Sequence, residues 1–229
     1  MEEIAVVSDV HSNLEALEAV LSHLGNRKVL FLGDLVGYGG SPNEVVEIFR
    51  RLGARGVRGN HDNAAVTGDV TWFNSRAAVA LSWTRRALSP NNIRFLGSLP
   101  LQISEEVNGT RVYLAHGSPE DNLHEYVSPR THLDLFPYYL KKTECDLIGL
   151  GHTHVPFVWE GEEGIVFNPG SVGQPRDGNP RASYATVNFE ESLPKVEIRR
   201  VEYDVGRAAA KIVQAGLPTE LADRVRLGL

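Results

Sequence analysis

The segment Gly59-Asn60-His61-Asp62 is the stretch from which the rest of the chain can be understood. It follows a short apolar run that ends at Val57-Arg58. Four other segments also place Asp, Asn or His directly after such a run: Asp9-Val10-His11-Ser12-Asn13, Gly33-Asp34, His116-Gly117 and Gly151-His152-Thr153-His154. Side chains at the carboxyl ends of neighbouring strands converge on one crevice in an open α/β sheet. These five segments therefore predict one shared site.

The residue types in these segments favour a site for two divalent metal ions. Two ions about 3.5–4 Å apart can hold the attacking and leaving oxygens of a phosphoryl displacement. A lone carboxylate at a strand end, Asp34, could bridge such a pair. Imidazole, carboxylate and amide oxygen without thiolate suit Mn, Fe, Ni, Co or Zn better than Cu(I) or an iron–sulfur cluster. The candidate ligands are Asp9, His11, Asp34, Asn60, His116, His152 and His154.

The first part of the chain predicts parallel β/α units. Apolar runs at residues 4–8 and 29–32 are typical of buried strands, and the short run to Val57-Arg58 is a third. A helix is expected from Asn13, a plausible N-cap, to Gly25, and another from Ser41-Pro42 to Gly53. Strands and helices that alternate with tight connections indicate a parallel sheet.

The second part of the chain is richer in strands. A helical pattern runs from Phe73 to about Leu99 with an interruption at Ser89-Pro90, and residues 129–142 predict one further helix. Strands are expected at residues 101–107, 111–115, 146–150, 155–159, 164–167, 183–189 and 196–203. Residues 205–229 predict two short helices, a C-terminal helical extension. We therefore expect a single α/β domain over residues 1–229, with two sheets packed face to face and helices outside.

Composition narrows the classes of protein that the chain could be. A net charge of −6, with arginines scattered among acids, argues against a stable nucleic-acid complex. The first apolar run is too short for a signal peptide or a membrane span. A single cysteine, Cys145, excludes an intrachain disulfide and fits a reducing cytoplasm. The expected partner is a phosphate-ester substrate, either a small molecule or a nucleotide, and the oligomeric state is left open.

The five segments together resemble the motifs of the calcineurin-like metallophosphoesterase superfamily, and they occur in the order and with the spacing that are typical of that family. The resemblance covers the chain from Ile4 to about Phe189. Within it the chain looks most like the small bacterial and archaeal phosphoesterases of the YfcE type. The resemblance implies a four-layer αββα sandwich. It also implies that one metal is held by Asp9, His11 and His154 and another by Asn60, His116 and His152, with Asp34 bridging the two metals. A bridging hydroxide would be the nucleophile, and His61 would be the acid that protonates the leaving oxygen.

One departure from the family pattern concerns the phosphate contacts. In the Ser/Thr protein phosphatase branch the Gly-Asp motif continues to an Asp and an Arg, where this chain has Gly37 and Tyr38. The absence of this Asp and Arg argues against a protein phosphatase and against a close relationship to symmetrical diadenosine tetraphosphatases. Asp62 is then the candidate that supports His61. Asn13, Arg58 and Arg176 are the expected substrate-binding residues, and Arg181 is a further candidate by position.

The predicted function is hydrolysis of phosphodiesters or phosphomonoesters at a dinuclear metal centre. Two alternatives remain: a nucleotide-directed hydrolase acting on diadenosine polyphosphates or cyclic nucleotides, and a non-catalytic scaffold of the same fold. The segment Asn168–Gln174 has two interpretations as well, a turn-forming loop or a lid that contacts phosphate.

Overall fold

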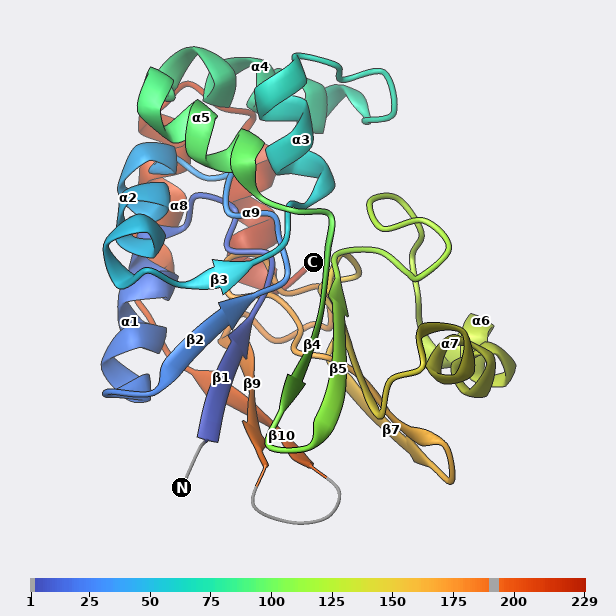
Figure 1. The fold of residues 1–229 in the computed structure, drawn as a ribbon. Coiled ribbons are helices and arrows are strands. Elements are labelled where there is room, and N and C mark those ends of the chain that lie inside the picture. Colours follow the sequence, from blue (N-terminus) through green and yellow to red (C-terminus); the bar gives the residue numbers. More distant parts are fainter. Residues whose placement is uncertain (1–2, 190–193) are drawn as a thin grey trace.

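Two mixed five-stranded sheets form the centre of the molecule in the computed structural model, which describes residues 3–189 and 194–229 (Figure 1). The first sheet has the order β10-β9-β1-β2-β3, with β1 parallel to β2 and β2 parallel to β3. Its strands are β1 (Glu3–Val7), β2 (Lys28–Phe31), β3 (Arg55–Gly56), β9 (Ala182–Asn188) and β10 (Lys195–Val201).

The second sheet has the order β4-β5-β6-β8-β7, with β5, β6 and β8 parallel. Its strands are β4 (Gln102–Val107), β5 (Thr110–Ala115), β6 (Leu147–Leu150), β7 (Phe157–Gly161) and β8 (Gly164–Asn168). The helices are α1 (Leu14–Leu24), α2 (Pro42–Leu52), α3 (Asn60–Thr67), α4 (Ser75–Ala87), α5 (Pro90–Ser98), α6 (Pro129–His132), α7 (Phe136–Thr143), α8 (Val205–Gln214) and α9 (Thr219–Leu227), and a 3₁₀ turn covers Leu133–Leu135.

The alternation of side chains along β1 explains the layered packing. Successive residues of a strand point to opposite faces. Ile4 and Val6 pack between the two sheets, whereas Ala5 and Val7 join the cluster of apolar side chains that includes α1 and α2. On the second sheet, the opposite face packs against α7 through Phe136. The α/β sandwich expected from the sequence is confirmed, with helices on both outer faces (Figure 1).

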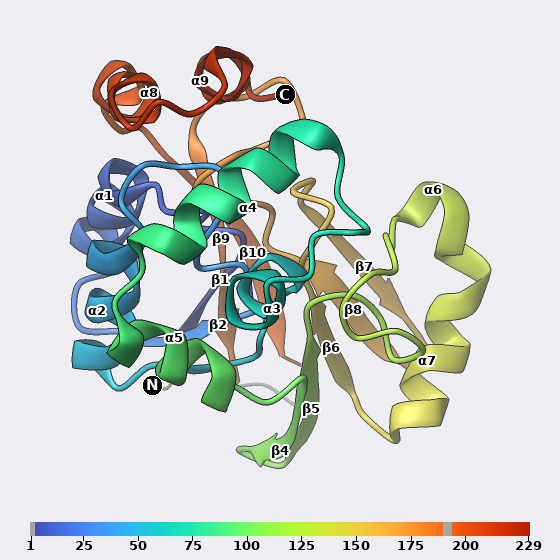
Figure 2. The same ribbon diagram turned by 90° about the horizontal axis from the view of Figure 1, so that it is seen from above.

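The C-terminal helices α8 and α9 form a hairpin that is attached to the rest of the molecule by its own apolar cluster. Leu221 and Val225 of α9 are buried there with Ala77 and Ala80 of α4 and with Tyr38. Viewed from above, α9 lies next to the first turn of α4 (Figure 2). Two short helices were expected in this segment, and the hairpin confirms them.

Two local features differ from those expected from the sequence. Asn60 begins helix α3, which was not predicted. The single helix expected over residues 129–142 is divided into α6, a 3₁₀ turn and α7. Pro137 lies in the first turn of α7, where its missing N–H leaves no helical hydrogen bond unsatisfied. Within the described residues, no helix has the length and apolar character needed to cross a membrane.

Candidate metal centre

The predicted ligands all follow strands that end at the same edge of the sandwich. Asp9 and His11 follow β1, Asp34 follows β2, and Asn60 follows β3 as the first residue of α3. From the second sheet, His116 follows β5, while His152 and His154 follow β6. The five segments of the sequence therefore meet as expected for the carboxyl ends of parallel strands.

Five of these ligands have backbone conformations that most residues avoid. Asp9, His11, Asp34, His152 and His154 have φ between 49° and 68°, in the left-handed region. Such a conformation costs about 1–3 kcal/mol for a non-glycine residue and persists where the surrounding structure imposes it. Here that strain turns each side chain inward at the end of its strand.

The first group of ligand atoms comes from Asp9, His11 and His154. His154 Nε2 lies 3.2 Å from Asp9 Oδ1, and His11 Nε2 lies 3.6 Å from the same oxygen. The two imidazole nitrogens are 3.1 Å apart. These three residues are buried, and their ligand atoms could hold one ion.

The second group comes from Asp34, His116, His152 and Asn60. His116 Nε2 lies 3.3 Å from Asp34 Oδ2 and 3.0 Å from Asn60 Oδ1. Asp34, His116 and His152 could hold an ion together. His11 Nε2 of the first group is 3.7 Å from the same Asp34 oxygen. Asp34 thus lies between the two groups, as a bridging carboxylate must.

Backbone carbonyls orient the imidazole rings. The Nδ1 atoms of His11 and His116 lie 3.0 Å and 2.7 Å from the carbonyl oxygens of Val36 and Leu32, and His154 Nδ1 faces the oxygen of Gln174. A carbonyl only accepts, so each Nδ1 carries the proton and Nε2 presents a lone pair to the site. Outer hydrogen bonds of this kind are typical of metal-binding histidines.

The inner atoms of the site lack partners of their own. Asp9 Oδ1 and Asp34 Oδ2 are buried and have no hydrogen-bond partner, although their carboxylates are otherwise held by Ser8, by the His152 N–H and by the His61 N–H. Two buried carboxylate oxygens that face imidazole lone pairs are stable only with positive charge among them. The residues therefore fit divalent cations.

In the metal-free protein the pKa values of the histidines differ widely. Burial lowers the pKa of His116, but the charges of Asp34 and Asp9 and the hydrogen bonds to Asp34 and Leu32 together outweigh it and raise that pKa to about 9. Burial lowers the pKa of His152 to about 3, with His116 adding to the effect, and lowers that of His154 to about 4. The ionic interactions of Asp9 and Asp34 with the histidines outweigh burial and keep both carboxyl pKa values below the ordinary range.

The first turn of helix α3 forms a hydrogen bond with Asp34. The His61 N–H in its first turn donates to Asp34 Oδ1 at 2.8 Å, as favoured for an anion at a helix N-terminus. Gly59 makes this approach possible, because a Cβ at that position would lie 2.0 Å from Asp34 Oδ1. Neither this contact between Gly59 and Asp34 nor the helix was predicted from the sequence.

Asp62 has a different set of contacts from the one expected. Its carboxylate accepts from the Gly59 N–H at 3.1 Å and from the Val36 N–H at 3.2 Å. His61 Nδ1, in contrast, is buried without a hydrogen-bond partner. The prediction that Asp62 supports the His61 ring is therefore corrected: Asp62 caps α3 and ties it to the loop after β2. Burial, with the charge of Asp34, raises its pKa to about 7.

Aromatic rings position the His61 side chain. Its ring lies 4.4 Å from that of Tyr38, 4.7 Å from that of His11 and 4.8 Å from that of Phe73, measured between centroids. Gly37 leaves room for it, since a Cβ there would lie 2.4 Å from His61 Nδ1. Gly37 and Tyr38, the departure from the family pattern, thus form one wall of the His61 pocket.

Of the three expected substrate-binding residues, Arg176 lies at the site. Its backbone N–H donates to the His154 carbonyl oxygen at 3.3 Å, and its guanidinium lies over the Tyr38 ring, 5.9 Å from the centroid. Its positive charge contributes to the low pKa values of His61 and His154, after burial. Arg176 therefore supplies a cation beside the position where the phosphatase branch has its own arginine.

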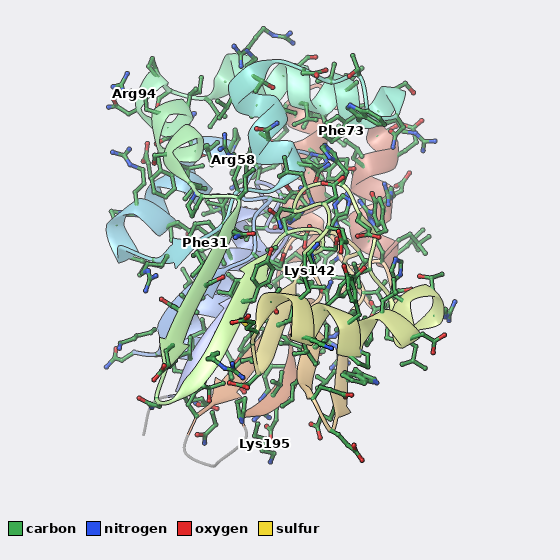
Figure 3. All side chains as sticks on the ribbon, turned by 45° about the vertical axis from the view of Figure 1, so that its right-hand side comes forward. Phe31, Arg58, Phe73, Arg94, Lys142 and Lys195 are labelled. Atoms are coloured by element: carbon green, nitrogen blue, oxygen red, sulfur yellow. The ribbon has the colours of Figure 1, made fainter. Side chains whose placement is uncertain are left out.

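The other two candidates are engaged elsewhere. Asn13 caps α1 by accepting from the Ala16 N–H, and its amide nitrogen donates to the Gly173 carbonyl oxygen at 2.9 Å. Arg58 contacts Asn63 of α3, and its backbone N–H donates to Pro100, just before β4 (Figure 3). These contacts give both residues structural roles, and substrate binding by Asn13 and Arg58 stays a prediction.

The segment Asn168–Gln174 forms hydrogen bonds with the backbone of the loops that carry the ligands. Asn168 donates to the Gly151 carbonyl oxygen at 2.6 Å, and the Ser171 hydroxyl donates to that of Asp9 at 2.7 Å. The segment is buried, and its Gln174 carbonyl orients His154. The segment is thus a turn-forming loop, as one of the two interpretations predicted: the Gly170 N–H donates to Asn168 Oδ1 at 2.8 Å and the Gln174 N–H to the Ser171 hydroxyl at 2.7 Å. It is also a buried support for two ligand loops.

Comparison with known proteins finds a family and several relatives. The model of the calcineurin-like phosphoesterase superfamily domain matches residues 2–192. The uncharacterized protein MJ0912 of Methanocaldococcus jannaschii is 44% identical over 98% of both chains. The phosphodiesterase YfcE of Escherichia coli is 25% identical over 82% of this chain and 88% of its own. The crystal structure of a metallophosphoesterase from Sphaerobacter thermophilus, 35% identical, superposes over 99% of both chains with a TM-score of 0.84.

Proposed function

This chain belongs to the calcineurin-like phosphoesterase superfamily, and on that basis we propose that it is a metal-dependent phosphoesterase acting on phosphodiesters or phosphomonoesters. The observation that carries the proposal is the pair of partnerless carboxylate oxygens, Asp9 Oδ1 and Asp34 Oδ2, buried among imidazole nitrogens. The phosphodiesterase YfcE, a relative over most of its length, supports the same class of reaction.

The ligand set is proposed to hold two ions. Asp9, His11 and His154 would hold one, and Asn60, His116 and His152 the other, with Asp34 shared. Two divalent ions supply charge that polarises a phosphoryl group and lowers the pKa of water. Mn, Fe, Ni, Co and Zn all accept this set of nitrogen and oxygen donors.

His61 is proposed as the acid that protonates the leaving oxygen. Burial holds its pKa well below the ordinary value, with Asp34 opposing that shift and other positive groups adding to it. The negative charge of a bound phosphate raises the pKa of a neighbouring imidazole. His61 would therefore take up its proton when substrate is present, and Tyr38 and Phe73 would hold its ring in place.

Arg176 is proposed to contact the phosphate, because its guanidinium lies over the Tyr38 ring and its backbone N–H donates to His154 of the first ligand group. Guanidinium groups bind phosphate through parallel, charge-assisted hydrogen bonds. Asp62 would contribute indirectly, by holding the first turn of α3 that presents His61.

The test is hydrolysis of bis-p-nitrophenyl phosphate and p-nitrophenyl phosphate by protein stripped of metal and then supplied with Mn²⁺, Ni²⁺, Co²⁺, Zn²⁺ or Mg²⁺. Turnover that depends on added metal is the expected result, and the ratio of the two rates identifies diester or monoester preference. Absence of turnover with every ion, in protein that binds two ions per chain, would contradict the proposal for these substrates. A nucleotide substrate or a scaffold role would then be favoured.

A further inference from the structure

Three arginines come from separate segments that pack together around Tyr38, on the side of the site where His61 lies. Arg176 follows the buried support segment, Arg76 lies in the first turn of α4, and Arg224 lies near the end of α9. Arg224 belongs to the hairpin beyond residue 192, where the match to the family domain ends. The domain that supplies the ligands therefore does not by itself supply this arginine.

The packing of the hairpin brings these segments together. Val225, next to Arg224, is buried in one apolar cluster with Tyr38 and with Ala77, which is next to Arg76. At the end of α9, the Gly228 carbonyl oxygen accepts from the Gly178 N–H at 2.9 Å, on the loop that carries Arg176. Figure 2 shows α9 and the first turn of α4 next to each other on this side of the molecule.

The three guanidinium groups have no carboxylate side chain opposite them among the described residues. Arg176 contacts the Tyr38 hydroxyl and the Gln174 side chain, and Arg224 Nε donates to the Leu229 carbonyl oxygen. Nearby carboxylates are engaged with other arginines, Asp223 with Arg226 and Asp177 with Arg200. The positive charge on this side of the site is therefore not neutralised by the chain.

The electrostatic effect of this arrangement is visible at Arg224. Burial lowers the pKa of its guanidinium, and the positive charges of Arg176 and Arg76 lower it further. Like charges held together in a partly buried place raise the free energy of the folded state. A bound anion relieves that repulsion and gains hydrogen bonds to planar guanidinium groups.

We propose that Arg76 and Arg224, beside Arg176, form a subsite for a second phosphate group of the substrate, next to the phosphate that Arg176 contacts and that reacts at the metal ligands. This deepens the proposed function and rests on it, because the first phosphate is taken to lie at the Asp34 centre. The substrate class is then a compound with two phosphate groups, such as a phosphoanhydride or a bisphosphate, and the C-terminal hairpin determines specificity.

The test compares the affinity of the metal-loaded protein for a monophosphonate with its affinity for bisphosphonates, measured by calorimetry. This measurement gives a result whether or not the protein hydrolyses an ester. The probes are propylphosphonate, propane-1,3-bisphosphonate and pentane-1,5-bisphosphonate. At least one bisphosphonate is expected to bind about tenfold more tightly than the monophosphonate, equivalent to about 1.4 kcal/mol. In Arg224→Gln and in Arg76→Gln that advantage is expected to fall below about threefold.

The matched control is Arg226→Gln, which removes an exposed arginine of the same helix that pairs with Asp223. It should keep the full bisphosphonate advantage. Arg76 is exposed, so its replacement keeps the test valid if Arg224→Gln fails to fold. The proposal is overturned if neither bisphosphonate gains over the monophosphonate, or if the gain survives both substitutions. Bisphosphonate selectivity without ester turnover would instead uphold this subsite and count against the proposed function.

Discussion

The proposed metal ligands and the proposed arginine subsite are held in the molecule in different ways. The ligands lie at strand ends, are buried, and are oriented by hydrogen bonds that they donate to backbone carbonyls or accept from backbone N–H groups. The arginines come from a loop and two helices, and each is at least partly exposed. The first arrangement suits a site whose geometry must be rigid. The second can change with a few surface substitutions, which suits specificity.

Asp34→Asn is expected to have the largest effect, because it removes the charge of the carboxylate shared by both ligand groups. We predict loss of at least one bound ion per chain and a decrease in kcat of about a thousandfold or more, in keeping with the charge that metal ions supply. Metal analysis and kcat on bis-p-nitrophenyl phosphate check this. Asp146→Asn, which breaks only the exposed pair with Arg111, is the control. Normal metal content in Asp34→Asn would rule out a bridging role.

His61→Ala separates catalysis from metal binding. Because no other residue is proposed to protonate the leaving group, kcat should decrease about 10²–10⁴-fold while two ions remain bound. The measurement is kcat together with metal content, and His23→Ala, at a histidine that contacts Tyr184 away from the site, is the control. An unchanged rate would favour the scaffold interpretation, or a ligand role for His61 if the metal content also fell.

Metal affinity should depend steeply on pH. The pKa of His116 is raised to about 9 in the metal-free protein, and an imidazole must lose its proton to bind a metal. Below pH 9 each binding event therefore displaces one proton, and affinity should rise about tenfold per pH unit from pH 7 to pH 9 before levelling off. Titrating metal-free protein with Zn²⁺ across this range measures it. An affinity independent of pH would show that His116 is already neutral.

Arg176→Ala is expected to reduce kcat/KM for a simple aryl diester about tenfold, because it removes one charge-assisted contact to phosphate. Steady-state kinetics with metal content verified is the measurement. Arg181→Ala is the matched control on the same loop, since Arg181 is exposed and contacts Asn179. Equal effects of the two substitutions would remove Arg176 from the phosphate contacts.

The smallest effect concerns the attachment of the hairpin. Lys211 of α8 forms an ion pair with the buried Glu15 at 2.7 Å, and Arg207 reaches the same carboxylate at 3.2 Å. Because Arg207 remains, Lys211→Met should lower the free energy of unfolding by only about 1 kcal/mol. Denaturation with urea measures this, with the exposed Lys142→Met as control. A loss of several kcal/mol would mean that the hairpin and the sandwich unfold together through this pair.

Much of the fold and the ligand set could be predicted from sequence, because both depend on local patterns. Apolar runs that end at Asp9, Asp34 and His116 indicate buried strands and place polar residues at their carboxyl ends, where strands of one sheet edge must converge. The helix at Asn60 was missed because a hydrogen bond from its first turn to Asp34, distant in sequence, stabilises it. Asp62 was misassigned for the same reason, since its partner Val36 is not adjacent in the chain.

The sequence by itself thus determined the chemistry of the centre: which side chains can bind metal, and that they follow strands. Only the tertiary structure decided what surrounds that centre. Arg224 lies in an ordinary amphipathic helix, and nothing in its local sequence separates it from Arg226 two residues later. Burial of Leu221 and Val225 against Tyr38 orients the helix, and of the two arginines Arg224 is then partly buried whereas Arg226 is exposed. Side-chain direction on a helix follows from what its apolar face packs against, and that partner is known only once the chain has folded.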